Sequence, residues 1–101
     1  MTSFDRSTAV IAQEAALFIA REAGHESLIT VIRAQPYAQG TRVCVFVSVF
    51  PKEKQVSALS FLSRMRENFS EHLKSHTRIR PLPRIDFALA EASGGDEKSL
   101  V

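Results

Sequence analysis

The sequence predicts an α+β fold in which three helices cover one face of a three-stranded sheet. Three observations predict it. Residues 9–23 contain strong helix formers and no breaker, residues 43–49 place valine at every second position, and residues 56–73 repeat apolar side chains at spacings of three and four. The predicted order is helix, strand, strand, helix, helix, strand. A two-layer packing is the simplest way to bury the valine face and the apolar helix stripes together.

The first predicted element is a helix over residues 9–23, preceded by a polar, frayed end. Its apolar side chains gather on one wide side, and glutamine, glutamate and arginine supply the polar positions. Asp5, Ser7 or Thr8 is expected to cap its first turn, because their side-chain oxygens accept hydrogen bonds from free backbone N–H groups. Gly24 is expected to end the helix, because glycine takes a positive φ without a steric clash.

Two predicted strands, residues 28–35 and 41–50, form a β-hairpin. The first is expected to stop at Pro36, which has no N–H to donate to a neighbouring strand. Alternate side chains of the second point to opposite faces of the sheet. We assign to the core the face that consists of Val43, Val45, Val47 and Val49. The opposite face, expected to stay open or only partly covered, carries Arg42, Cys44, Phe46 and Ser48.

The apolar stripe of residues 56–73 predicts two helices with a break between them. Pro51 suits the first turn of the first one. Asn68 and Glu71 match the first and last positions of a capping box, in which the side chains satisfy the N–H groups at a helix start. The break is therefore expected at Arg66-Glu67-Asn68.

The chain ends in a third predicted strand and a tail. The last helix is expected to end near His76, because the prolines at 81 and 83 cannot occupy a helix interior. Residues 84–90 alternate apolar with other side chains and predict a strand. Residues 91–101 are polar and are expected to form a flexible tail, which leaves residues 1–90 as one domain.

Composition and length exclude several classes of protein. A hydrophobic share of 45% with 24% charged residues is normal for a globular domain with a small core. The single cysteine, Cys44, excludes an internal disulfide and a cysteine-rich metal site. The longest charge-free apolar run, residues 43–50, is too short to span a bilayer, and the N-terminus lacks a signal-peptide pattern. We therefore expect a soluble, cytoplasmic protein that does not act at a membrane.

The sequence offers no constellation for catalysis. No glycine-rich loop is present to cradle a phosphate, and no pair of carboxylates sits in an apolar context. His72 and His76 stand four residues apart, a spacing that can chelate a metal on a helix, but no further ligand pattern accompanies them. We expect the two histidines to add partial positive charge to an exposed face. The protein is expected not to be an enzyme and to use no metal, no cofactor and no small-molecule substrate.

What remains is a basic segment, residues 64–84. Six basic side chains there oppose two acidic ones, a local charge of +4, while the whole chain carries +2. Alternate residues of an extended chain point the same way, so Arg78 and Arg80 should project together, and guanidinium groups bind phosphate oxygens bidentately. The segment predicts contact with an RNA backbone, and the competing interpretation is a solvated surface. The candidate RNA-binding residues are Arg64, Arg66, Lys74, Arg78, Arg80 and Arg84.

Three runs of residues carry a family resemblance: VIAQEAALFIAREA, LITVIRAQPYAQGTRVCVFVSVF and NFSEHLKSHTRIRPLPRIDF. In this order they resemble ribosome-binding factor A, a family of bacterial assembly factors, over residues 6–89. The resemblance implies a type II KH-like fold, α-β-β-α-(kink)-α-β, without a catalytic site. It also implies binding to small-subunit ribosomal RNA and free 30S subunits during late maturation. In the family, a small-x-Gly sequence forms the kink between the two helices. The matching residues in this chain are Arg66-Glu67-Asn68, which contain no glycine. We expect a monomer.

The alternative is a KH-like scaffold for protein–protein interaction. Its docking surface would be the open sheet face with Arg42, Cys44 and Phe46, or an edge strand. Affinity for ribosomal RNA that falls steeply with salt would favour the RNA-binding function, whereas salt-insensitive binding to a protein would favour the scaffold.

Overall fold

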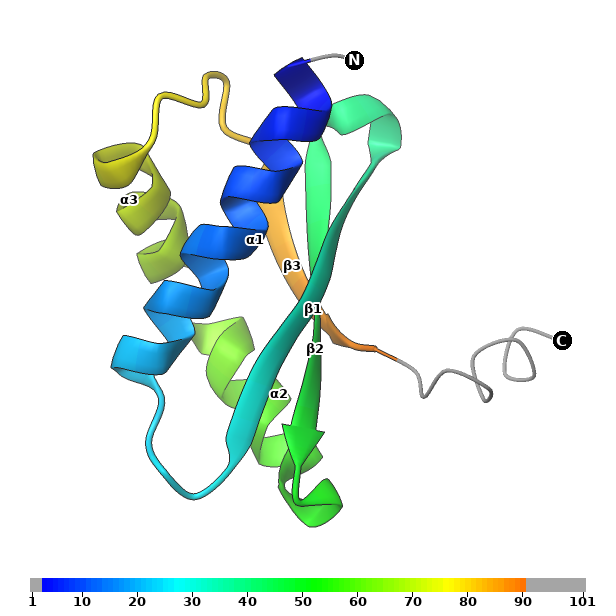
Figure 1. Cartoon of the computed structure of the whole chain (residues 1–101), viewed down its shortest axis with the longest axis vertical. Helices are drawn as coiled ribbons and strands as arrows, with labels where there is room; N and C mark the ends of the chain where they lie inside the picture. The colour runs from blue at the N-terminus through cyan, green and yellow to red at the C-terminus, as the bar shows by residue number, and fades with distance from the viewer. Residues whose placement is uncertain (1–2, 91–101) are drawn as a thin grey trace, which may run out of the picture.

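The computed structural model describes residues 3–90, which form an α+β fold with helices packed on a three-stranded sheet (Figure 1). Pro51 precedes a 3₁₀ turn, so the helix expected there begins at Gln55. The predicted fold class and order of elements are confirmed, and the predicted tail lies outside the described residues. Within residues 3–90, no helix combines the length and apolarity needed to cross a membrane.

The elements are α1 (Ser3–Glu22), β1 (Leu28–Tyr37), η1 (Ala38–Gly40), β2 (Arg42–Phe50), η2 (Lys52–Lys54), α2 (Gln55–Arg64), α3 (Arg66–His76) and β3 (Arg84–Leu89).

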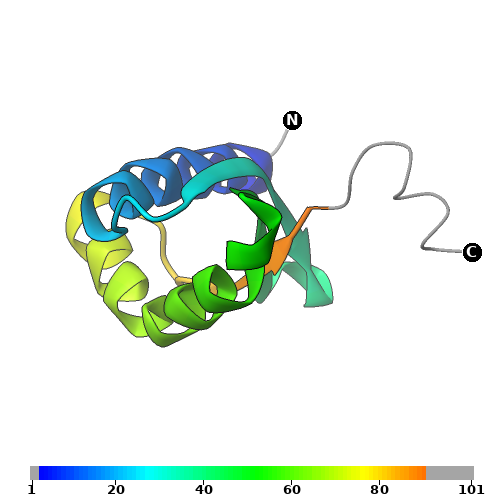
Figure 2. The ribbon, with the colours of Figure 1, turned by 90° about the horizontal axis from the view of Figure 1, so that it is seen from below.

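β2 is the central strand of a mixed sheet. It pairs with β1 in antiparallel orientation through the hairpin, and with β3 in parallel orientation. A parallel partner requires a long crossover connection, and α2 and α3 supply it. The three helices gather on one side of the sheet, as the view along the molecule shows (Figure 2). The predicted two-layer packing results from this arrangement.

The valine face of β2 forms the floor of the core, as predicted. Val43, Val45 and Val47 are at most 1% exposed, and Val49 is 7% exposed. Burying each such side chain contributes about 1.5–3 kcal/mol, so this face decides which side of the sheet meets the helices. Side chains from all three helices and from the neighbouring strand β3 complete this core, among them Ile11, Phe18, Leu62, Phe69, Leu73 and Ile85.

α1 begins six residues earlier than predicted. Its first residue is Ser3, so Asp5, Ser7 and Thr8 lie inside the helix and the capping prediction is wrong. The polar residues before position 9 contain no breaker, and the helix that follows extends through them. Gly24 follows the helix end as predicted, because α1 ends at Glu22 and the Ala23 N–H still donates to the Ile19 carbonyl oxygen, but Gly24 does not take the expected positive φ.

β1 continues through Pro36 to Tyr37, two residues beyond its predicted end. Pro36 is tolerated because β1 is an edge strand, where backbone N–H groups on the outer side have no partner strand. The connection to β2 is correspondingly tight. Ala38, Gln39 and Gly40 have φ values of 52°, 56° and 86°, and three successive left-handed residues reverse the chain.

The break between the helices lies at Met65, and the prediction of Arg66-Glu67-Asn68 is wrong in position. Met65 has φ −92° and ψ 5°, and it both ends α2 and precedes α3. These angles are open to any L-residue, so the break needs no glycine. Asn68 lies inside α3 rather than at its cap. A small-x-Gly pattern ending at this break would fall on Ser63-Arg64-Met65.

His72 is buried, contrary to the expectation that it adds charge to an exposed face. It is 8% exposed, and its ring packs against those of Phe18 and Phe69, with centroids 5.4 and 6.0 Å away, while the two phenylalanine rings also contact each other. Its Nδ1 lies 3.3 Å from Arg21 Nη2, and its Nε2 lies 2.7 Å from Glu14 Oε1. Because arginine only donates, Nδ1 accepts and the Nε2–H group donates to Glu14. His72 thus joins α3 to α1.

His76, one turn further along α3, stays exposed. Its ring stacks on that of His72 with centroids 4.0 Å apart, and its Nδ1 lies 2.9 Å from the His72 carbonyl oxygen. Within the described part of the chain, no group of three or more His, Cys, Asp or Glu side chains could hold a metal ion.

Candidate nucleic-acid interface

The segment between α3 and β3, residues 77–83, presents Arg78 and Arg80. Ile79 and Leu82 of the same segment pack against the core and hold it in place. Arg78 and Arg80 are exposed, whereas Ile79 between them is half-buried. Both arginines line one hollow, described below, so they lie on a common surface, as predicted.

Arg80 is oriented by the end of α3. Its Nη1 donates to the carbonyl oxygen of Ile79 at 2.6 Å, and its Nη2 donates to that of Lys74 at 3.2 Å. Carbonyl groups in the last turn of a helix have no helical partner, so a guanidinium group satisfies them and complements the negative helix end. Thr77 acts similarly, because its hydroxyl donates to the Leu73 carbonyl oxygen at 2.7 Å. The segment thus leaves α3 in a fixed direction.

Arg66 is engaged by the carboxylate of Asp86 on β3, and its Nη1 lies 3.2 Å from Oδ1. The same carboxylate accepts hydrogen bonds from the Tyr37 hydroxyl and from Arg42 Nη2, the latter at 3.1 Å. The Tyr37 hydrogen bond, reinforced by Arg42 and Arg66, lowers the pKa of Asp86. One carboxylate therefore faces two guanidinium groups, and the cluster retains positive charge.

The other three predicted residues are exposed on separate elements. Arg64, at the end of α2, donates to a serine hydroxyl one turn earlier at 2.9 Å. Lys74 on α3 lies 3.4 Å from a carboxylate oxygen of Glu71. Arg84 is the first residue of β3. Exposed pairs of this kind contribute little to stability, so these cations can exchange their partners for phosphates.

The predicted residues surround two different hollows. One, of about 430 Å³, lies between α3 and the start of β3. Its basic lining residues are Arg66, Lys74 and Arg84, and its acidic ones are Glu67 and Glu71. Because two carboxylates share this space with three cations, its attraction for a polyanion is reduced.

The second hollow, of about 420 Å³, contains Arg78 and Arg80 in its lining and, among residues 6–90, no acidic side chain. It lies between the first turns of α1, the turn after β1 and the segment leading to β3. Arg64 lines neither hollow. The structure thus brings five of the six predicted residues to concave surfaces, three in one place and two in another.

Three arginines outside the predicted set lie outside these two hollows. Arg6 lines a further hollow together with Arg78, although the two residues are far apart in the sequence. Arg42 faces Asp86 on the open side of the sheet, where the alternation of β2 places it. Arg33 lies with its guanidinium carbon 4.3 Å from the centroid of the Phe46 ring. The alternation signals Arg42, but no local pattern connects Arg6 with Arg78.

The open sheet face is less bare than its sequence predicts. Phe46, the best candidate for an exposed aromatic ring, is half-buried beneath Arg33. Cys44 beside it is also half-buried, and burial raises the pKa of its thiol. A ring covered by a guanidinium group is not available for base stacking until that group moves.

No protein-family model matches the sequence, and no curated protein matches it. The crystal structure of ribosome-binding factor A from Thermus thermophilus aligns with a TM-score of 0.70 and 28% identity, over 81% of this chain and 90% of that one. The solution NMR structure of a Thermotoga maritima protein provisionally assigned as ribosome-binding factor A aligns with a TM-score of 0.66 and 19% identity, over 83% of each chain. The second likeness concerns the fold alone. The predicted resemblance is confirmed: over most of its length, this chain is similar to ribosome-binding factor A in its fold and in the order of its elements.

Proposed function

We propose that this protein is a non-enzymatic assembly factor that binds small-subunit ribosomal RNA during late maturation of the 30S subunit. The observation that carries the proposal is the likeness to ribosome-binding factor A over 81% of the chain. In this proposal residues 1–90 act as the RNA-binding unit, as a monomer in the cytoplasm. The protein needs no cofactor, metal or small-molecule substrate, and its partners are the RNA and free 30S subunits.

The exposed arginines supply the chemistry of this binding. Guanidinium groups hold phosphate oxygens by paired hydrogen bonds, and Arg78, Arg80 and Arg84 are exposed. Arg64 and Lys74 add positive charge on the neighbouring helices. Arg66 contributes through the cluster around Asp86, where it is exchangeable because its side chain is 45% exposed. Such contacts position the RNA backbone without reading its sequence.

The direct test is fractionation of a native lysate on a density gradient, with detection of this protein across the fractions. We expect it to migrate with free small subunits and to be absent from translating ribosomes. Detection only in the light fractions at low salt, where electrostatic contacts are strongest, would contradict ribosome binding.

A protein-binding scaffold is the second candidate, and an exposed apolar pair favours it. Leu28 and Phe50 are cross-strand neighbours on β1 and β2, and they are 66% and 72% exposed. Exposed apolar pairs are common at protein interfaces. Replacing both residues by serine separates the candidates, because an RNA-binding factor keeps its salt-dependent affinity for ribosomal RNA and a scaffold loses its partner.

A further inference from the structure

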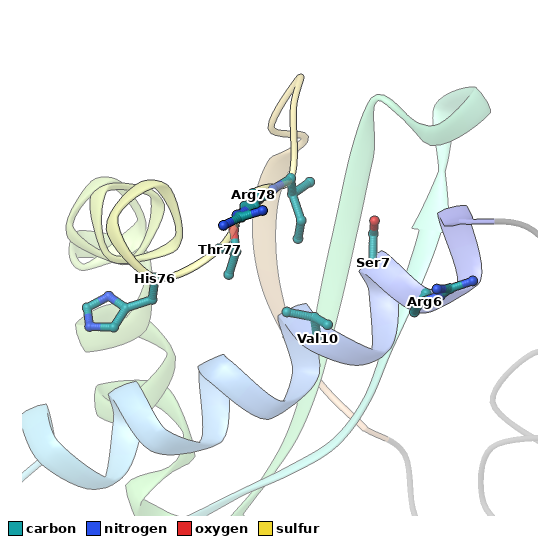
Figure 3. A pocket seen from close by; sticks show the side chains of 7 residues that line it. Arg6, Ser7, Val10, His76, Thr77 and Arg78 are labelled. Carbon is teal, nitrogen blue, oxygen red and sulfur yellow. Dashed lines mark hydrogen bonds between the residues drawn. The ribbon is translucent and has the colours of Figure 1, made fainter.

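Arg78 lies between two neighbouring hollows, where the first turns of α1 meet the segment between α3 and β3. The first hollow, of about 450 Å³, is bounded by Arg6, Ser7 and Val10 of α1 on one side (Figure 3). The second is the hollow of about 420 Å³ described above. Ser7, Arg78 and Ile79 line both hollows. The two hollows are therefore adjacent and meet at these three residues, and we refer to them together as the trough.

The trough combines an apolar floor with a basic rim. Val10 of α1 and Ile79 of the α3–β3 segment supply the apolar surface. Ser7 stands one turn before Val10, and the two side chains project from the same side of α1 (Figure 3). Arg6 and Arg78 are exposed and belong to the two walls. An apolar surface next to guanidinium groups fits a ligand with a flat, weakly polar body and an attached anion.

The charge of its lining distinguishes this trough from the other concave surfaces described. The hollow between α3 and β3 contains Glu67 and Glu71, the one between α1 and α3 contains Glu22 and Glu71, and the one beside α2 contains Glu26. The two hollows that meet at Arg78 have no acidic lining residue within the part of the chain whose side chains are described, residues 6–90. Among the side chains of residues 6–90, Arg6, Arg78 and Arg80 therefore attract a phosphate there with no acidic lining residue to oppose them.

We infer that this trough binds an unpaired nucleotide of the RNA, with the base on the floor of Val10 and Ile79 and the flanking phosphates on Arg6 and Arg78. The inference rests on the proposed function and specifies the RNA that is bound, namely RNA with an unpaired nucleotide. A paired base is stacked within its duplex and cannot enter a hollow, whereas a bulged or single-stranded base can be splayed out. A volume of about 450 Å³ lies within the range of small-ligand sites.

The test compares three synthetic RNA hairpins by fluorescence anisotropy: fully paired, with one bulged nucleotide, and with an abasic residue in the bulge. We expect the wild-type protein to prefer the bulged hairpin by roughly fivefold to tenfold, as burial of one face of a base would give. The abasic hairpin should bind like the paired one, because it keeps the phosphate and lacks the base.

The variant Ser7→Trp fills the trough without changing a charge. It should abolish the preference for the bulge, so that the variant binds the bulged and the paired hairpin equally. Ala16→Trp is the matched control, because Ala16 is exposed on α1 and does not line the trough. It should behave like wild type. Circular dichroism and thermal melting establish that both variants are folded.

Three results would overturn the inference. In the first, wild type binds paired and bulged hairpins equally, which leaves RNA binding itself intact. In the second, Ser7→Trp retains the preference. In the third, Ser7→Trp weakens binding to intact small subunits and not to any RNA, which would show that the trough accepts a protein segment. Absence of all RNA binding would remove the proposed function together with this inference.

Discussion

Arg66 and Asp86 form an ion pair that connects the start of α3 to β3, with Nη1 and Oδ1 3.2 Å apart. Arg66 is the first residue after the break at Met65, so the pair fixes the beginning of α3 against the edge of the sheet. Tyr37 and Arg42 reach the same carboxylate from β1 and β2. One side chain thereby links all three strands to a helix.

The variant Asp86→Asn should lower the free energy of unfolding by about 1 kcal/mol at pH 7, because an amide cannot hold the charge-assisted hydrogen bonds. The pKa of Asp86 is lowered in the folded protein, chiefly by the Tyr37 hydrogen bond. This contribution is therefore present above the ordinary carboxyl pKa of about 3.9 and is lost as the pH falls through the lower folded value. Urea unfolding at pH 7 and at decreasing pH measures it.

The difference between wild type and Asp86→Asn should accordingly shrink below about pH 4. Glu53→Gln, at an exposed position in η2, is the control and should change stability little at any pH. A wild-type-to-variant difference that stays constant from pH 7 to pH 3 would show that Asp86 is not specially stabilised as a carboxylate.

Val45→Asp should abolish folding, because Val45 is fully buried and the new carboxylate would have no partner in the core. Ser48→Asp is the matched control on the same strand, since Ser48 is exposed. Thermal unfolding followed by circular dichroism distinguishes them. A cooperative transition in Val45→Asp close to that of the control would mean that the valine face is not the core.

Asn68→Ala tests the position of the helix break. Replacing an N-cap asparagine by alanine lowers the free energy of unfolding by about 1 kcal/mol. Replacing an exposed asparagine inside a helix by alanine raises it by up to about 0.5 kcal/mol. Asn68 lies inside α3 and is exposed, so the variant should be slightly more stable than wild type. Backbone chemical shifts should be helical from Arg66 to Leu73. If the variant were instead less stable by about 1 kcal/mol, Asn68 would be the N-cap residue of α3.

Arg78→Gln combined with Arg80→Gln should flatten the dependence of log affinity on log salt concentration. Each lost phosphate contact removes about 0.9 from the slope on duplex and about 0.7 on single strands, so the double variant should lose roughly 1.4 to 1.8. The affinity should fall for every RNA tested, because backbone contacts carry no sequence preference.

The control for this charge change is Arg33→Gln combined with Lys52→Gln. It removes the same formal charge from β1 and η2, away from the trough, and should change the slope less. If the folded Arg78/Arg80 double variant kept the wild-type slope on small-subunit RNA, the RNA contact would have to lie elsewhere, with the open sheet face around Phe46 as the next place to examine.

The sequence predicts those parts of the fold that depend on local periodicity. Alternating valines place β2 and its buried face, because a one-residue shift would bury the arginine and serine instead. The beginning of α1 and the break at Met65 carry no such signal. The polar first turns of α1 have no apolar period, and Met65 occupies backbone angles that any residue can adopt. Pro36 leads to a wrong end for the first strand, because a proline interrupts a central strand and is tolerated in an edge strand.

In the candidate interface, too, some features follow from the local sequence and others depend on long-range contacts. Exposure of Arg78 and Arg80 follows from their alternation with Ile79, so the sequence finds them. The pairing of Arg66 with Asp86 and the approach of Arg6 to the Arg78 segment depend on contacts between distant parts of the chain. The burial of His72 is of this kind too, because its partners Glu14 and Arg21 come from α1.

The mixed pairing of the sheet sets an order in which it can be assembled. β1 and β2 are joined by a turn of four residues, so their ladder closes a short loop at a small entropic cost. β3 joins β2 in parallel only after the chain has passed through α2 and α3, which makes its contacts long-range and slow to form. Until β3 docks, Asp86 is absent from the sheet and the Val43–Val47 edge is unpaired. β3 thus pairs onto a hairpin that is already formed. The segment that carries Arg78 and Arg80 takes its final position when β3 pairs with β2.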